Sequence, residues 1–329
     1  AENQKLAEPL IPVIGEDIAR RIFSRTWNIR EEGLKTLDQE VRLESRSKVL
    51  NYSDPGAAFV ALFGVVSHTI NDKIVQVAQK SMGLLQTLLT KEPRNIGNRN
   101  ELNAYVDTVV TGLLDRIGDS NIKTRELAEQ SFMALVKSPA VTCNYCVAAL
   151  VKPPPTGQSV KHKTANSTKH ILAKLGLLRQ IIQDFGINNQ NVPYNPVVQY
   201  VVDKLENSNP EIRQGAFNII VDIYALVGEK LKNDLTGVRP QHMEMLQKEF
   251  DNISGGGQSY NTGGSGGREP IITTNINPHG GAKKGGNAGP SSNKGGKDTK
   301  GAQSNKAPQS GKYNSFSSFF FYCVRIILI

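Results

Sequence analysis

The sequence predicts an all-α protein, a solenoid of stacked helix pairs over residues 15–253 with a Gly-rich tail behind it. Apolar residues recur at spacings of three and four through these residues, which is typical of helices with one buried face. Breaks rich in Pro, Gly and Asp divide them into segments of about 10–20 residues, the usual helix length. Related sequence features also return every 40–48 residues. No alternating apolar run bounded by turns is present, so we expect no strands.

Each predicted helix has an apolar face and an identifiable start or stop. The breaks fall at Asp54-Pro55-Gly56, Glu92-Pro93, Pro153-Pro154-Pro155 and Asn209-Pro210. Three of the faces are formed by Val109, Leu113, Leu114 and Ile117, by Leu127, Ala128, Phe132, Leu135 and Val136, and by Ile219, Ile220, Ile223, Tyr224 and Val227.

A repeat becomes visible when two segments are laid over one another. Residues 118–128 match residues 206–216, with Ser-Asn, an Arg four residues later and an Ala three after that. A small residue followed by apolar positions also recurs, at Gly33, Ser81, Ala128, Gly176 and Ala216, and Ala173 would serve as well as Gly176 for the fourth. In an all-helical chain, a period near 40–47 indicates HEAT or armadillo helix pairs.

Five such pairs fit the chain, and stacking them buries apolar faces that no pair could bury alone. We expect the small residue to let the helices of a pair approach closely, and the Ser-Asn or Asp start to cap the second helix. The expected pairs are 15–45, 57–91, 98–137, 139–186 and 193–232, closed by a helix near 240–252.

Charge separates the body from the tail. The whole chain has a net charge of +9, but the 76 residues after Ile253 hold nine Lys and Arg against two acidic residues. The first 253 residues therefore have a net charge of +2 and are not a uniformly basic fold, which argues against a nucleic-acid partner for the body.

Both ends of the chain lie outside the predicted solenoid. Residues 1–14 are expected to be a linker, and the C-terminal tail divides into two parts. Residues 254–315, rich in Gly, Ser, Asn and Lys, are predicted to be a disordered linker whose charge could attract acidic partners. Residues 316–329 are apolar but too short to span a bilayer. They are interpreted as a terminus of doubtful status, outside the native coding sequence, with an interfacial anchor as the alternative.

The sequence points away from an enzyme. Cys143 and Cys146 form a CxxC without a second ligand pair, so we expect two ordinary cysteines on a buried helix and no metal site. Three cysteines in all fit a reducing compartment. No phosphate-binding loop and no Ser, His and Asp constellation occur, so we expect no catalysis, no cofactor, no small-molecule substrate and no membrane partner.

The turns inside each pair should line up along one edge of a solenoid. Each predicted turn has a Lys or Arg at or near its tip, which gives a basic edge suited to an acidic protein partner. Trp27, the single tryptophan, lies in the first turn between Arg25 and Arg30. It is either an exposed anchor for a partner or a half-buried packing residue. Each basic residue could instead pair with an acid of the next repeat.

This array resembles a TOG domain, the HEAT-like tubulin-binding module of microtubule plus-end regulators. Residues 22–32 and 243–251 resemble, more narrowly, the TOG domain of a centrosomal protein of ciliary tips. The residues that carry the resemblance are Thr26, Trp27 and Arg30 in the first turn, Lys73 in the second, Asp119, Ser120, Asn121, Lys123 and Arg125 in the third, and Asn207, Ser208, Asn209 and Arg213 in the fifth.

The resemblance implies a monomeric domain whose turn edge binds αβ-tubulin or microtubule ends. It implies a role at microtubule plus ends or ciliary tips, in the cytoplasm and cytoskeleton, at the cilium tip, basal body or centrosome. Trp27 would insert at the tubulin surface with support from Arg30. The residues it assigns to tubulin binding are Trp27, Arg30, Lys73, Ser120, Asn121, Lys123, Arg125, Lys163, Lys169, Asn209 and Arg213.

Two other function classes stay open on sequence alone. One is a generic HEAT or armadillo adaptor that binds an acidic protein or peptide in a groove along a helix face. The other is nucleic-acid binding through the basic tail. If Trp27, Lys73, Lys123 and Arg213 share one exposed edge, tubulin binding is favoured.

Overall fold

The computed structural model describes residues 6–153 and 167–255, and within these ranges it confirms an all-α helical-repeat fold. The only extended pairing among them is an isolated bridge between Asn188 and Val192. The elements are α2 (Ile11–Ile14), α3 (Glu16–Ile22), α4 (Trp27–Leu43), η1 (Glu44–Arg46), α5 (Pro55–Thr69), α6 (Val75–Leu89), α7 (Arg99–Arg116), α8 (Ile122–Val136), α9 (Cys143–Val151), α11 (Thr168–Phe185), α12 (Tyr194–Leu205), α13 (Pro210–Val227), η2 (Gly228–Leu235) and α14 (Pro240–Gly255).

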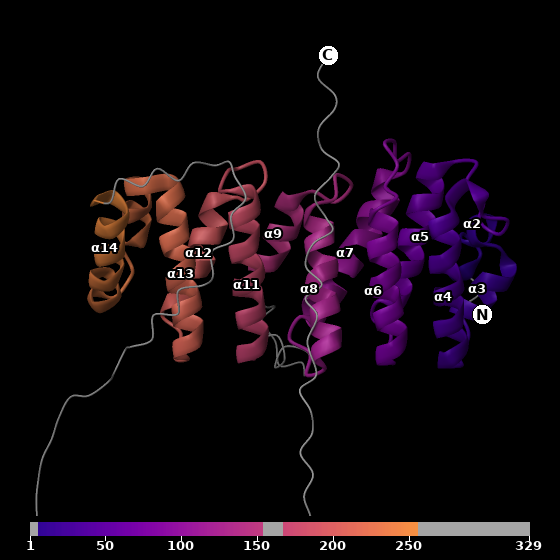
Figure 1. Ribbon diagram of the computed structural model, residues 1–329, viewed down its shortest axis with the longest axis horizontal. Coiled ribbons are helices and arrows are strands. Elements are labelled where there is room, and N and C mark those ends of the chain that lie inside the picture. Colours follow the sequence, from indigo (N-terminus) through magenta and orange to yellow (C-terminus); the bar gives the residue numbers. More distant parts are fainter. Residues whose placement is uncertain (1–5, 154–166, 256–329) are drawn as a thin grey trace, which may run out of the picture. The chain divides into compact units, whose positions relative to one another are not determined.

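The helices form two layers, and each pair contributes one helix to each layer. The pairs are α3 with α4, α5 with α6, α7 with α8, α9 with α11, and α12 with α13. The second helices pack side by side in the order α4, α6, α8, α11 and α13, and α5, α7, α9 and α12 follow one another in the other layer (Figure 1). A continuous apolar core lies between the layers.

Hydrogen bonds between neighbouring repeats show the repeat length directly. Gln79 donates to Thr124 and Gln86 donates to Ser131, each at 2.9 Å and 45 residues apart. Arg42 donates to Thr87, also 45 residues away, at 2.7 Å. Equivalent positions of successive second helices therefore face each other, which fixes the register of the stack as well as its order.

The predicted close approach within a pair is present in the first three pairs. A Cβ atom at Gly33 would lie 2.8 Å from the Cβ of Arg21, so α3 and α4 touch there. Ser81 and Ala128 are fully buried at the same position of their helices, seven residues after the N-cap. Ser81 also accepts a hydrogen bond from Thr69 across its pair at 2.8 Å.

Neither Gly176 nor Ala173, the residues predicted for the fourth small position, occupies that position in the structure. Gly176 is exposed, and a Cβ there would meet no atom within 4 Å. Because Ser167 caps α11, the position seven residues after the cap belongs to Lys174. The neighbouring α9 has only 9 residues and ends at Val151. The fourth pair thus places a lysine where its neighbours place a small residue.

The folded part begins earlier than the sequence pattern indicates. Leu10 and Ile14 are buried, with 4% and 0% of their surface exposed, although residues 1–14 were predicted to be a linker. The backbone N–H of Asn51 donates to the carbonyl of Val13, which joins this stretch to the next loop. Pro9 and Pro12 interrupt the helical pattern here, so the short apolar face is hard to recognise.

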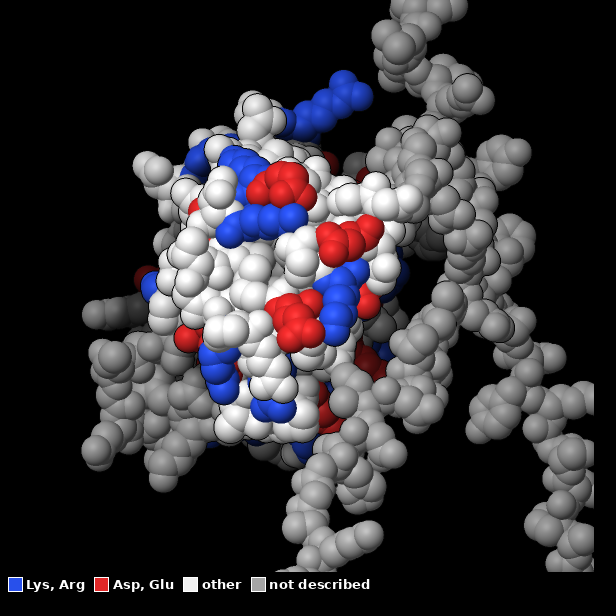
Figure 2. All heavy atoms as spheres, turned by 90° about the vertical axis from the view of Figure 1, so that its left-hand side faces the viewer, with Lys and Arg blue, Asp and Glu red and all other residues white. Residues whose placement is uncertain are grey.

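The other end is closed by α14, which runs to Gly255, slightly beyond the predicted 240–252. Phe250 is fully buried and stacks on Tyr224 of α13, with ring centroids 3.9 Å apart. The outward side of α14 is polar and includes a Lys248–Glu244 ion pair of 3.0 Å. Figure 2 shows this end of the stack with acidic and basic side chains interspersed among uncharged ones. A polar outer face is what the last unit of a solenoid requires. Beyond Gly255, the tail and the apolar terminus lie outside the described residues.

Candidate functional site

The turns inside the pairs lie along one edge of the stack, at the lower edge of Figure 1, where α4, α6, α8, α11 and α13 begin. Side chains cap three of these helices. Asn121 accepts from the N–H of Thr124, and Asn209 accepts from two N–H groups of α13. Ser167 accepts from the N–H of His170. The predicted capping by Asn121 and Asn209 is confirmed, and the caps fix how each turn is presented.

Trp27 is the first residue of α4, and 44% of its surface is exposed. It is therefore not sealed in the core, and its ring is available to a partner. Burying an aromatic ring of this kind is a large source of binding energy at protein interfaces.

A hollow of about 490 Å³ separates the first turn from the second and brings predicted site residues together. Trp27, Arg30 and Lys73 all line it. His68 lines it too and packs against Phe23 with the two rings tilted by 32° and their centroids 4.4 Å apart. Partial burial is the main cause that lowers the pKa of His68 from its ordinary value. His68 could not be recognised from the turn pattern, because it lies on α5, in the other layer of helices.

Arg30 is the best-connected side chain of the hollow. Its Nε and Nη2 donate to the two carboxylate oxygens of Asp72 at 2.7 and 3.0 Å, and its Nη1 donates to the carbonyls of Ser24 and Arg25. The side chain is only 14% exposed. Arg30 is therefore one of the basic turn residues that pair with an acid of the next repeat. Through the Ser24 and Arg25 carbonyls, Arg30 also holds the backbone of the first turn, just before Trp27.

Arg125 and Arg213 occupy the same position as Arg30, four residues after their N-caps. Arg125 donates to the carbonyl of Asp119, and Arg213 donates to the carbonyls of Asn207 and Ser208. Each guanidinium folds back over its own turn, in the same way as Arg30. These half-buried arginines hold the turns and leave only part of each guanidinium open to a partner.

Apart from Arg25 in the first turn, the exposed cations of the described part of the edge are lysines. Lys73, Lys123 and Lys169 are exposed in or beside the second, third and fourth turns, and no ion pair ties them to an acid within the described residues. Ser120 is exposed beside Lys123. Lys163 lies outside the described residues. Trp27, Lys73 and Lys123 thus share one exposed edge, and Arg213 lies half-buried on it.

One exposed residue on this edge was missed from the sequence. Ile122 is the first residue of α8, and 61% of its surface is exposed, the largest fraction among the large apolar residues that the structure describes. It occupies the same position in α8 that Trp27 occupies in α4. The signal was available, since Ile122 directly follows the capping Asn121.

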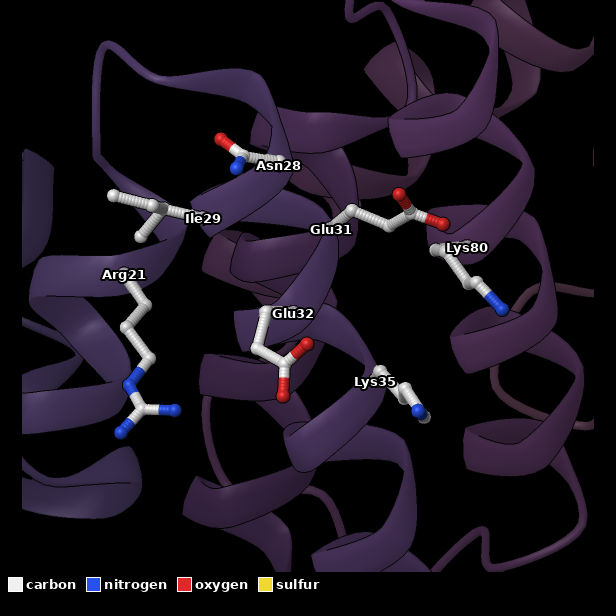
Figure 3. Close-up of a pocket in the computed structure, with 7 residues that line it drawn as sticks. All are labelled: Arg21, Asn28, Ile29, Glu31, Glu32, Lys35 and Lys80. Carbon is white, nitrogen blue, oxygen red and sulfur yellow. The ribbon is translucent and has the colours of Figure 1, made fainter.

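A second hollow, of about 610 Å³, lies on the helix face between α3, α4 and α6. In Figure 3, Glu31 reaches towards Lys80, and Glu32 lies between Arg21 and Lys35. Both signs of charge alternate across this hollow, so no group of like charges converges on one ligand. Ile29 and Asn28 form its end towards the first turn.

The remaining candidate chemistry is weak in the described residues. Cys143 and Cys146 are buried as predicted, and burial raises their thiol pKa values to about 11 and about 12, which keeps both protonated. No three His, Cys, Asp or Glu side chains of the described part gather into a group that could hold a metal ion. None of the helices in that part has the length and apolarity that a bilayer crossing demands.

Comparison with known proteins gives a consistent match. The family described as "Centrosomal protein CEP104, TOG domain" matches residues 4–219. The human centrosomal protein of 104 kDa is 27% identical over 228 residues, which are 66% of this chain and 23% of that protein. The chain therefore spans about a quarter of the length of the human, mouse and rat forms of this curated relative.

Solved structures agree on the fold. The TOG domain of human Cep104 superposes with a TM-score of 0.58 at 22% identity, covering 77% of this chain and 96% of that domain. A structure from work on TOG–tubulin binding specificity in microtubule dynamics and spindle formation also reaches 0.58, at 15% identity, covering 75% of this chain and 86% of the other.

Proposed function

This chain belongs to the family of CEP104 TOG domains, and from that premise we propose that it binds αβ-tubulin along the edge formed by its intra-pair turns. The binding is non-catalytic, by a monomeric domain. One observation carries the proposal: Trp27 stands exposed at the start of α4, on the same edge as Lys73 and Lys123.

The chemistry of the edge fits an acidic protein with an apolar site. An exposed aromatic ring can supply binding energy when a partner buries it, and the exposed lysines on the same edge favour a partner of opposite charge. Arg30, Arg125 and Arg213 already hold their turns in the unbound protein, so little conformational freedom of these turns is lost on association. The work that produced the similar TOG structure names tubulin as the partner, and tubulin is therefore the acidic protein that we propose for this chain.

The cellular role follows from the relatives. The human and mouse relatives are centrosomal proteins, so we place this domain on the cytoskeleton, at microtubule plus ends or at the cilium tip, basal body or centrosome. Because the chain spans only about a quarter of those proteins, their other regions would add further contacts.

The alternative is an adaptor that binds an acidic protein or peptide on the helix face. The hollow between α3, α4 and α6 is the feature that favours it. Glu31 and Glu32 lie among the cations of that hollow and would repel an acidic ligand. The turn edge, with its unpaired lysines, suits an acidic partner better.

Size-exclusion chromatography of the full chain with purified αβ-tubulin at low salt tests the proposal. We expect the wild-type chain to co-elute with tubulin and Trp27→Glu to elute alone. The matched control is Leu226→Glu, since Leu226 is 52% exposed near the end of α13 that faces away from the turn edge. Absence of wild-type co-elution would refute tubulin binding, and equal effects of the two variants would refute the assigned edge.

A further inference from the structure

The first residues of the second helices form a row along the turn edge, one from each repeat. Trp27, Val75 and Ile122 form the apolar half of the row, and the other members have no large apolar side chain. The last two members of the row are a threonine and a proline, which is common at this position of a helix. In chain order the members are Trp27, Val75, Ile122, Thr168 and Pro210.

Within the apolar half, the outer two members are the exposed ones. Trp27 is 44% exposed and Ile122 is 61% exposed, while Val75 between them is half-buried. With helices packed 8–10 Å apart, Trp27 and Ile122 are separated by about 20 Å. That distance is well within the width of one protein–protein contact patch.

Cations border this apolar stretch. Lys73 precedes Val75 by two residues, and Lys123 directly follows Ile122, both exposed. An apolar centre with a charged rim is the usual anatomy of a specific protein interface. An isoleucine this exposed, in a turn otherwise made of polar residues, contributes nothing to the core of the stack.

We propose that Ile122 is a second apolar anchor for αβ-tubulin, so that turns one to three bind an uncharged patch of tubulin whose surroundings are acidic. The inference rests on the proposed function and makes it more specific. Trp27 and Ile122 act as the two ends of one apolar contact, and Lys73 and Lys123 direct the acidic rim of tubulin towards it.

The test measures the dissociation constant of the full chain for fluorescently labelled αβ-tubulin. We expect Ile122→Ser to weaken binding about tenfold and Ile122→Val about twofold, because an apolar contact loses affinity with each buried carbon removed. Leu226→Ser is the matched control, since Leu226 is 52% exposed away from the turn edge, and we expect it to leave affinity unchanged.

Salt dependence separates an apolar anchor from an electrostatic effect. We expect Ile122→Ser to keep the wild-type slope of affinity against salt concentration, and Lys123→Ala to reduce that slope. Circular dichroism and thermal denaturation are used to check that Ile122→Ser and Lys123→Ala are folded. Because Ile122 is exposed, neither should lower the melting temperature appreciably.

Each outcome decides one question. Wild-type affinity for Ile122→Ser, together with loss of binding by Trp27→Glu, would overturn the second anchor and leave tubulin binding intact. Equal weakening by Ile122→Ser and Leu226→Ser would also overturn it, because the effect would not belong to the turn edge. If the wild-type chain binds no tubulin, the proposed function itself fails.

Discussion

Arg30 and Asp72 join the first two turns of the stack through two hydrogen bonds of 2.7 and 3.0 Å, and both side chains are largely buried, at 14% and 12% exposure. Asp72 also accepts from the N–H of Ile74, at the start of α6. Arg116 donates to the carbonyls of Ile70 and Asp72 from the third repeat. The second turn is therefore held from both sides, and its position relative to Trp27 is fixed.

We predict that Asp72→Asn lowers both stability and tubulin affinity. The amide can still accept from Ile74, but it cannot neutralise Arg30, and an unpaired, largely buried charge costs about 2 kcal/mol. Urea denaturation measures the loss. Affinity should fall as well, because the first two turns are no longer held at a fixed distance.

The control for Asp72→Asn is Asp222→Asn. Arg179 and Asp222 form a similar pair, at 2.7 Å and 43 residues apart, between the bodies of α11 and α13. Its side chains are more exposed, at 42% and 24%, so we expect a loss below about 1 kcal/mol. Tubulin affinity should not change. If tubulin affinity drops equally for both variants, the position of the second turn does not determine tubulin affinity.

Lys123 tests the charge of the edge. We predict that Lys123→Glu slows association with tubulin and weakens affinity by about tenfold at low salt, with a smaller effect at high salt, because charge near a binding edge steers association. Lys137 ends the same helix α8 on the far side and pairs with Asp184 at 3.5 Å. Stopped-flow measurements should give wild-type association rates for Lys137→Glu. Slowing by both variants alike would mean that net charge, not the turn edge, controls the rate.

Much of the fold could be predicted from the sequence because every helix pair must bury an apolar face against its neighbours, so the same sequence features recur. Apolar spacing, turn residues and the recurrence near 45 residues predicted all five helix pairs and the closing helix. Gly176 was misassigned because the fourth repeat contains the short α9 and has Lys174 at the position where the other repeats have a small residue. Counting from the capping Ser167 finds that position, while spacing alone does not.

The site was predictable as an edge but less so as a set of contacts. Sequence placed Trp27, Lys73 and Lys123 on it because turns of stacked repeats align. It could not show that Arg30 is engaged by Asp72, since the two are 42 residues apart. His68 was missed for a related reason: it reaches the hollow from α5, outside the turn motif.

Phe250 tests whether α14 belongs to the folded unit, since the family match ends at residue 219. We predict that Phe250→Ala destabilises the domain by about 3 kcal/mol, because it empties a fully buried site stacked on Tyr224. Met245→Ala on the same helix should cost less than about 1 kcal/mol, because Met245 is 36% exposed. Equal melting temperatures for Phe250→Ala and the wild-type chain would mean that α14 contributes no stability.

Lys174 should make stability depend on pH. Burial, aided by the charge of Lys204, lowers the pKa of Lys174 to about 8 from its ordinary value of 10.5, against the opposing pull of Asp115. Below pH 8 the lysine is charged in both the folded and the unfolded chain, and the folded state carries the full cost, up to about 3 kcal/mol. Between pH 8 and 10.5 the unfolded chain binds the extra proton, so this cost disappears as pH rises.

We therefore predict that Lys174→Met is more stable than the wild-type chain at pH 7, by up to about 3 kcal/mol, and that the difference shrinks at pH 10. Urea denaturation at both pH values measures it, and comparing variant with wild type cancels the titration of groups that both share. Lys80→Met, at an exposed position of α6, should show no such pH-dependent gap. A difference for Lys174→Met that is the same at pH 7 and pH 10 would mean that the lysine is solvated in the folded protein, and that the fourth pair carries no buried charge.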